Sequence, residues 1–224
     1  MTTLTTRRFG ARADLEAALT VRLSAALTAP GAHAVMLSGG ETPLPVYRRL
    51  AKQGLRHDDR LHVLFSDERY VPSDAAASNF HQSWPLLETL GLPAESLLRV
   101  PTERSLAEAT AAYDRALAAL LASGIPLGLG LLGLGADGHT ASLFTAQDLE
   151  RARGRFAIEV ARPDGLSAIS VTPELLANVR EPLFVVIEAG KEQAVQRLLA
   201  RDTQLTAWRA VQGCSDVELW LAAA

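Results

Sequence analysis

The tripeptide Asp137-Gly138-His139 is the segment of this chain whose residue types point most clearly to catalysis. A free imidazole has a pKa of about 6.5, so a histidine can take up and return protons at neutral pH. A nearby aspartate can orient the ring and stabilise its protonated form. The spacing therefore predicts a general base, His139, positioned by Asp137. The remaining histidines are interpreted as ordinary surface or core residues: His33, His57, His62 and His81.

A glycine pair within the segment SGGETP, residues 38–43, has the composition of an anion-binding turn. Glycines let the backbone turn tightly and approach a ligand closely. Thr42 is a candidate cap for a helix with Pro43 at its first position, and the free N–H groups of a helix N-terminus attract phosphate. Taken alone, the segment fits an ordinary strand-to-helix turn equally well. The residues predicted to contact phosphate here are Ser38, Gly39, Gly40 and Thr42.

Charged residues, Asp67-Glu68-Arg69, directly follow an apolar run. Two carboxylates beside a buried strand cost free energy unless they are used or paired. One interpretation is a structural ion pair between Glu68 and Arg69. The other places a carboxylate and the guanidinium in a binding pocket, with Asp67 and Arg69 as the contacts.

Lys191 follows a second apolar run and begins a predicted helix. Its ammonium group is expected at the open edge of the sheet. Two interpretations remain for this position, a solvated lysine at a helix start and a cation that binds phosphate.

Other catalytic signatures are absent or misplaced in the sequence. Gly128, Gly130 and Gly133 match a dinucleotide-binding spacing, but they lie inside an apolar run rather than in a strand-to-helix turn. The sequence contains no G-x-S-x-G elbow, P-loop or H-E-x-x-H motif. A single cysteine, Cys214, can form neither an internal disulfide nor a cysteine metal cluster. We therefore expect no cofactor and no metal site.

The elements that must position these residues alternate along the chain. Apolar runs predict strands at residues 33–37, 61–65, 127–132, 156–160, 169–172, 183–188 and 217–221. Helical periodicity and Ser78 as an N-cap predict helices at residues 14–27, 43–52, 79–89, 104–121 and 191–200. This alternation predicts an α/β fold, a Rossmann-like, mostly parallel sheet flanked by helices. Ligands of such sheets bind beyond the carboxyl ends of the strands, so the polar segments should open toward one side.

Composition limits the class of protein further. A chain of 224 residues with 48% hydrophobic and 21% charged residues predicts one α/β domain, residues 1–224. The net charge is −3 and no stripe of Lys and Arg occurs, so we expect no nucleic-acid partner. The N-terminus lacks the apolar core of a secretion signal, and no apolar run reaches the roughly 20 residues of a membrane span. We expect a cytoplasmic protein without a membrane partner.

Taken together, the polar segments resemble those of the 6-phosphogluconolactonase family, within the glucosamine-6-phosphate isomerase/6-phosphogluconolactonase superfamily. They occur in the family's order over nearly the whole chain. The matching segments are SGGETP at 38–43, SDERYVP at 66–72 with Ser78-Asn79, LLGLGADGHTASLF at 131–144 and, more loosely, AGKEQAV at 189–195. The resemblance implies a fold like that of glucosamine-6-phosphate deaminases and ribose-5-phosphate isomerases.

The resemblance also implies an activity and a substrate. The substrate would be a small sugar-phosphate lactone, 6-phospho-D-glucono-1,5-lactone, hydrolysed to 6-phosphogluconate as the second step of the oxidative pentose phosphate pathway. His139, oriented by Asp137, would take a proton from the attacking water. Lys191, Arg69 and the Gly39-Gly40 turn would hold the phosphate, and no cofactor or metal would be needed.

Two positions depart from the family's pattern. Thr145 stands where the family usually has proline. Ala168 stands where the family usually has an arginine that is a candidate phosphate contact. Arg162 is the candidate replacement, and the sequence leaves its role open.

Alternatives from other classes remain. Glucosamine-6-phosphate deaminases share the SGG and DGH segments, but they carry a catalytic glutamate where this chain has Phe144, and a phenyl ring cannot move protons. A sugar-phosphate isomerase is a related alternative. A non-catalytic sugar-phosphate-sensing module would keep the phosphate-binding turn and could dispense with His139. Association with glucose-6-phosphate dehydrogenase, which makes the lactone, is left open by the sequence.

Overall fold

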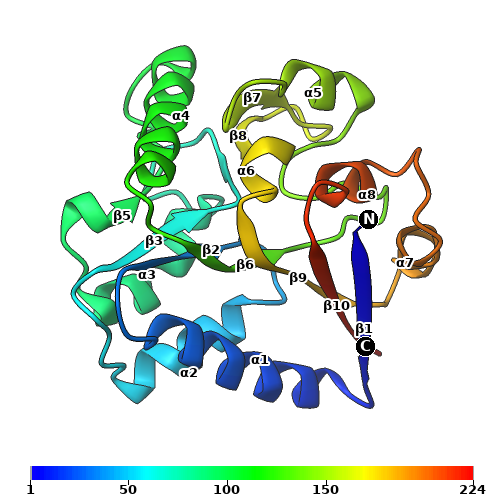
Figure 1. The fold of residues 1–224 in the computed structure, drawn as a ribbon, viewed down its shortest axis with the longest axis horizontal. Coiled ribbons are helices and arrows are strands. Elements are labelled where there is room, and N and C mark those ends of the chain that lie inside the picture. The colour runs from blue at the N-terminus through cyan, green and yellow to red at the C-terminus, as the bar shows by residue number, and fades with distance from the viewer. Residues whose placement is uncertain (1, 224) are drawn as a thin grey trace.

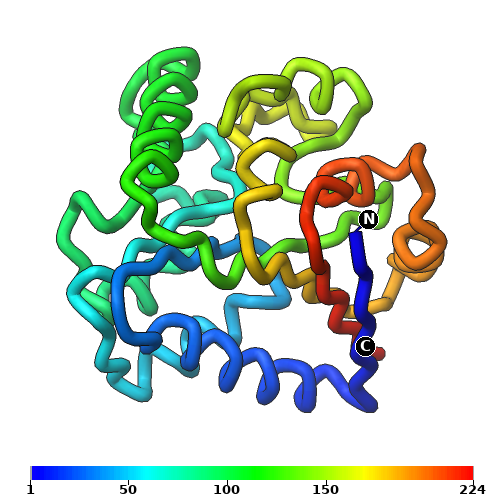
Figure 2. The backbone as a smooth tube through the Cα atoms, viewed as in Figure 1, coloured from blue at the N-terminus to red at the C-terminus, as the bar shows by residue number. Residues whose placement is uncertain are grey.

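The computed structural model describes residues 2–223 and contains a large parallel sheet covered on both faces (Figures 1 and 2). The described pairings of this sheet are all parallel. This confirms the predicted α/β fold with a mostly parallel sheet. In spatial order the strands are β1 (Thr3–Phe9), β10 (Asp216–Ala222), β9 (Val179–Ile187), β6 (Leu127–Leu132), β2 (His33–Leu37), β3 (Leu61–Phe65) and β5 (Leu97–Leu98).

The direction in which the chain adds strands reverses between β2 and β6. From β2 the chain continues through β3 to β5 at one edge, whereas from β6 it continues through β9 to β10 toward the other. The segments that leave β2 and β6 therefore diverge to opposite sides and leave a crevice at their carboxyl ends. Crevices of this kind are the usual ligand sites of open α/β sheets.

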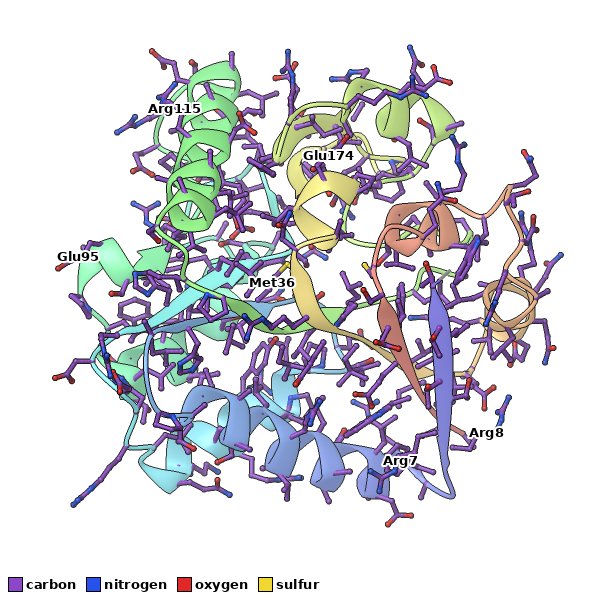
Figure 3. The ribbon with its side chains drawn as sticks, in the orientation of Figure 1. Arg7, Arg8, Met36, Glu95, Arg115 and Glu174 are labelled. Carbon is purple, nitrogen blue, oxygen red and sulfur yellow. The ribbon has the colours of Figure 1, made fainter. Side chains whose placement is uncertain are left out.

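Side chains of the central strands divide the core into two layers. Val35 and Leu37 of β2 face one layer of helices, while Ala34 and Met36 face the other. This alternation is the period-two pattern of a strand buried on both faces. Figure 3 shows Met36 near the centre of the molecule.

The helices cover the two faces unequally (Figure 1). One face packs against α1 (Arg12–Leu27), α2 (Leu44–Gln53) and α3 (Asn79–Leu90). The opposite face packs against α4 (Leu106–Ala122), α5 (Ala146–Arg151), α6 (Pro173–Leu176), α7 (Glu192–Leu199) and α8 (Thr206–Val211). A single turn of 3₁₀ helix, η1, spans Ala94–Ser96. None of the helices in residues 2–223 is long and apolar enough to cross a membrane.

A small antiparallel sheet lies over the second face. It consists of β4 (Asp67–Arg69), β8 (Ser167–Val171) and β7 (Ala157–Ala161) in that order. The segment Asp67–Arg69, for which the sequence predicted no strand, is therefore a strand. The strands predicted near residues 156–160 and 169–172 exist, but they pair here rather than in the main sheet.

Ser66 explains why the chain changes sheets after β3. Its N–H still donates to Leu37 O of β2, at 2.8 Å, while its carbonyl oxygen accepts from Val171 N of β8, at 2.9 Å. The residue thus belongs to both sheets, and the next residues continue along β8. The small sheet is held in this way against the carboxyl edge of β2 and β3.

The helix ends confirm one predicted cap and correct another, and they show the role of Thr145. Ser78 caps α3, as expected, by accepting a hydrogen bond from His81 N at 3.1 Å. Helix α2 begins at Leu44 after Pro43, and Thr42 makes no capping bond, so the predicted Thr42 cap is wrong. Thr145, where the family usually has proline, caps α5 in a reciprocal pair with Asp148.

Candidate active site

A cavity of about 590 Å³ opens at the carboxyl ends of β2, β6 and β9. The four polar segments predicted to open toward one side of the sheet do meet here. Of the predicted site residues, Asp137 alone is not part of the cavity wall, and it lies directly behind His139. The predicted residues that line the cavity are Ser38, Gly39, Gly40, Thr42, Asp67, Arg69, His139 and Lys191.

His139, in the wall of this cavity, forms a hydrogen-bonded pair with Asp137. Nδ1 of His139 lies 2.5 Å from Oδ1 of Asp137, and the backbone N–H of His139 donates to the same oxygen at 3.2 Å. A proton on Nδ1 satisfies this contact and leaves Nε2 as the proton acceptor. The imidazole is 27% exposed, so it is accessible to water yet fixed in orientation.

The electrostatics of Asp137 suit an orienting role. Partial burial raises the pKa of its carboxyl group, but the hydrogen bonds from the His139 ring and N–H outweigh burial and hold the pKa below its ordinary value. The carboxylate therefore stays ionised at neutral pH. An ionised partner favours the protonated imidazole that a general base forms during reaction.

Gly135 makes room for this pair. The turn closes through Gly138 N–H donating to Gly135 O, at 3.0 Å, and Gly135 N–H donating to His139 O, at 2.9 Å. A Cβ atom on residue 135 would lie 2.2 Å from Nδ1 of His139 and 2.5 Å from Oδ1 of Asp137. Any other residue would displace the pair, because real Cβ atoms do not approach so closely.

The glycine turn after β2 has the features of an anion site. Within residues 2–223, the backbone N–H groups of residues 39–42 donate no hydrogen bond. Gly39 packs so tightly that an added Cβ would lie 2.0 Å from Oδ1 of Asn79. Gly40 has a φ of 98°, in the left-handed region that favours glycine. Unpaired N–H groups beside a glycine turn attract anions.

Lys191 lies in the cavity wall at the start of α7. Among the described residues, its ammonium group forms no ion pair within 4.0 Å. Burial lowers its pKa from the ordinary lysine value, and the negative charge of Glu41 partly offsets this effect. A half-buried, unpaired cation in a cavity favours the phosphate-binding interpretation over the solvated one.

Glu68 has a structural role, but not the predicted one. Its buried carboxylate accepts hydrogen bonds from the N–H groups of Asn79 and Phe80, both at 2.7 Å, and from the Ser78 hydroxyl at 3.2 Å. It thereby satisfies the open N-terminus of α3. Its side chain forms no ion pair with the guanidinium of Arg69 among the described contacts, so that expectation is wrong.

Arg69 and Asp67 reach the cavity from β4. Nη1 of Arg69 donates to Asn79 Oδ1 at 2.9 Å and to a backbone carbonyl, which fixes its guanidinium at the cavity wall. Asp67 is 7% exposed and accepts hydrogen bonds from the hydroxyls of Ser66 and Ser142, each at 2.8 Å. Both residues of the predicted contact pair therefore lie where a ligand can touch them.

Among the polar residues that line the cavity, Arg12, Glu41 and Asn79 were not predicted as contacts from the sequence. Arg162, whose role the sequence left open, lines the cavity as well. Arg12 begins α1, directly after β1, and the sequence showed no apolar run that would reveal β1. Four cationic side chains and two carboxylates, Glu41 and Asp67, line the cavity. The excess of positive charge suits a phosphate monoester, which carries about two negative charges near neutral pH.

The glycines of the dinucleotide-like spacing do not form a strand-to-helix turn. Gly128 and Gly130 lie within β6, as expected, and Gly133 follows β6 in the cavity wall. Burial raises the pKa of the Cys214 thiol to about 11, which disfavours a nucleophilic thiolate. Within residues 2–223, no group of three or more His, Cys, Asp and Glu side chains is arranged to hold a metal ion.

Comparison with known proteins gives similarity over almost the whole chain. The family model described as "Glucosamine-6-phosphate isomerases/6-phosphogluconolactonase" matches residues 10–220. A 6-phosphogluconolactonase from a Nostoc species is 34% identical over 210 residues, covering 89% of this chain and 85% of that protein. One from a Synechocystis species is 34% identical over 213 residues, covering 91% and 87%. The crystal structure of a 6-phosphogluconolactonase from Thermotoga maritima superimposes with a TM-score of 0.80 at 27% identity, covering 100% of each chain.

Proposed function

Because this chain belongs to the glucosamine-6-phosphate isomerase/6-phosphogluconolactonase family, we propose that it hydrolyses 6-phospho-D-glucono-1,5-lactone to 6-phosphogluconate. The observation that carries the proposal is one cavity that combines an oriented histidine with an unpaired lysine and a turn of free N–H groups. The relatives that match 89% and 91% of the chain carry the name of this enzyme.

His139 acts on the water that attacks the lactone. Nε2 takes a proton from the water as its oxygen forms a bond to C1, and the π electrons of the carbonyl move to its oxygen. When the carbonyl reforms, the bond from C1 to the ring oxygen breaks, and that oxygen takes the proton from the imidazolium. Asp137 keeps Nδ1 protonated throughout and stabilises the charged ring.

The phosphate occupies the other part of the cavity. The free N–H groups of residues 39–42, with Ser38 and Thr42 alongside, receive its oxygens, and Lys191 and Arg69 balance its charge. This placement holds C1 near His139, so binding energy from the phosphate contributes to orientation of the reacting centre.

Phe144 disfavours the deaminase alternative. Its ring centroid lies 4.4 Å from that of His139, so an apolar ring fills the space beside the base. Incubation with glucosamine 6-phosphate should release no ammonia, whereas the phosphorylated lactone should be consumed. Ammonia release at a rate comparable to lactone hydrolysis would replace this function with deamination.

Gly135→Ala is expected to lower kcat for the lactone by about 10-fold or more, because the added methyl group displaces His139 and Asp137. Gly128→Ala is the matched control, since its Cβ would meet only Ala34 O, at an ordinary 3.6 Å. Initial rates and thermal melting would be measured for both. Equal activities of the two variants would show that the close approach at Gly135 does not position the catalytic pair.

Binding of 6-phosphogluconate is expected to weaken with rising pH. The pKa of Lys191 is lowered by burial, so its ammonium loses the proton at a lower pH than an ordinary lysine, and its attraction to phosphate is lost with it. Calorimetric titrations from about pH 7 to 10 would measure the affinity, because the product is stable where the lactone is not. Lys191→Arg should flatten the profile, since arginine stays charged. An unchanged profile in that variant would assign the titration to another group.

A further inference from the structure

Arg162 brings a guanidinium group into the cavity from the small sheet. It follows β7 at the hairpin to β8, where its N–H donates to Leu166 O at 2.8 Å. Its side chain lines the cavity and is only 13% exposed. Within the small sheet, Val160 of β7 pairs with Ala168 of β8. Arg162 lies two residues after Val160, so its side chain is on the same face of the small sheet as that of Val160. The hairpin therefore projects this cation over the carboxyl edge of the main sheet.

The guanidinium group is fixed, but two of its donors are unused. Nε and Nη2 donate to the carboxylate of Asp164, at 3.1 and 2.9 Å, and Nη1 donates to Ser142 Oγ at 3.3 Å. Arginine has five N–H donors in a rigid plane. One N–H on Nη1 and one on Nη2 thus have no partner within residues 2–223. The exposed Asp164 holds the group in place and leaves these donors for a ligand.

The surroundings of Arg162 place it at the same end of the cavity as the base. Its guanidinium carbon lies 5.5 Å from the ring centroid of Phe144, and that ring contacts His139. Its other partner, Ser142, belongs to the same loop as His139 and also donates to Asp67. The Arg162 side chain is therefore attached to the catalytic loop by two separate contacts.

Two cations of the cavity, Lys191 and Arg12, lie beside Glu41 and not beside Arg162. Lys191 is influenced electrostatically by Glu41, and Nη2 of Arg12 donates to the carbonyl of Glu41 at 3.4 Å. No contact with Arg162 is recorded for Lys191, Arg12 or the glycine turn among residues 2–223. Arg12 and Lys191 thus lie beside Glu41, whereas Arg162 lies beside the catalytic loop. Arg69 is held by Asn79 and acts electrostatically on Asp164, the partner of Arg162.

We propose that Arg162 is a catalytic residue that stabilises the oxyanion formed at C1 of the lactone. The inference rests on the proposed function. As water attacks C1 and gives its proton to His139, the carbonyl π electrons become an oxygen lone pair, and the free N–H groups on Nη1 and Nη2 donate to that oxygen. When the pair returns to reform the carbonyl, the ring oxygen leaves and takes the proton from His139. Donors fixed before the reaction stabilise this charge without reorganising.

Arg162→Gln tests the assignment, with Arg153→Gln as the matched control because Arg153 is an exposed arginine outside the cavity. Arg162→Gln is expected to lower kcat by about 10- to 100-fold on both 6-phosphogluconolactone and unphosphorylated gluconolactone, since both form the same oxyanion. Competitive inhibition by inorganic phosphate should change less than about twofold, because the groups assigned to the phosphate, Lys191, Arg69 and the turn at residues 39–42, all remain in this variant. Arg162→Lys, which keeps the charge but loses the planar fork, should recover part of the rate.

The outcomes separate this inference from the proposed function. A loss confined to the phosphorylated lactone, together with weaker inhibition by phosphate, would overturn the oxyanion role and make Arg162 a phosphate ligand. Unchanged kcat in a folded Arg162→Gln protein would also overturn it, while wild-type turnover in the same assay would still support lactone hydrolysis. Melting temperatures of the variants within a few degrees of wild type would show that rate losses are not losses of fold.

Discussion

Replacing His139 with alanine is expected to lower kcat for the phosphorylated lactone by about 10²- to 10⁴-fold, the usual contribution of a general base. The variant loses the imidazole that takes the proton from water. Asp137 then has no imidazole to orient, so it cannot replace this function. The fold should persist, because His139 lies in a loop in the cavity wall and contributes little to the core. Progress curves at saturating substrate, corrected for spontaneous ring opening, would measure the loss.

His81→Ala provides the control, because His81 is an exposed histidine on α3 outside the cavity. Its kcat and melting temperature should stay close to those of the wild type. If His139→Ala kept more than about a tenth of the wild-type kcat, the assignment of the base would be wrong.

Lys191→Ala should lower kcat/KM for the phosphorylated lactone by about 10- to 150-fold. A hydrogen bond to a charged group contributes about 1.5–3 kcal/mol, which corresponds to this range. The substitution removes one positive charge from the cavity and leaves the glycine turn at residues 38–43 intact. Hydrolysis of unphosphorylated gluconolactone should barely change, since that substrate has no phosphate to lose. Rates on both substrates, measured with the same enzyme preparations, give the comparison.

Lys52→Ala is the matched control, because Lys52 is the other lysine of the chain and lies exposed in the last turn of α2. It should leave both substrates unaffected. Equal losses on the phosphorylated and unphosphorylated lactones in Lys191→Ala would show that Lys191 supports the catalytic loop instead of the phosphate.

The carboxyl ends of the central strands could be predicted from the sequence, because the residue pattern that marks them is local. In β2, β3 and β6 a short apolar run stops at a polar or glycine-rich segment, so the end of the strand is visible in consecutive residues. Once strands and helices alternate, parallel pairing follows, and the exits must share one edge. This argument alone predicted that one edge of the sheet carries His139, Lys191 and the turn at residues 38–43.

The features that the sequence did not predict depend on contacts between distant parts of the chain. β4 is only 3 residues long and becomes a strand by pairing with β8, about a hundred residues later. β1 reads TLTTRRF and lies at the edge of the sheet with mostly exposed side chains, so it lacks the apolar pattern of the central strands. Arg12 follows β1 and Arg162 follows β7, and neither position in the cavity could be derived without those pairings.

Glu68 illustrates a different limit. Its neighbour Arg69 offers an obvious partner in sequence, yet its carboxylate turns to the start of α3 and accepts N–H groups ten or more residues away. Four unpaired donors at a helix N-terminus compete strongly for a buried carboxylate. Spacing along the chain cannot reveal that competition, because it depends on how α3 packs against β4.

Hydrolysis of freshly generated 6-phospho-D-glucono-1,5-lactone by the purified protein tests the central claim most directly. Acid release would be followed at neutral pH with wild type, His139→Ala and a no-enzyme control, so that spontaneous opening is subtracted. The account predicts saturable hydrolysis by the wild type, proportional to enzyme concentration and nearly abolished in His139→Ala. Wild-type rates equal to the uncatalysed rate would contradict the proposed function.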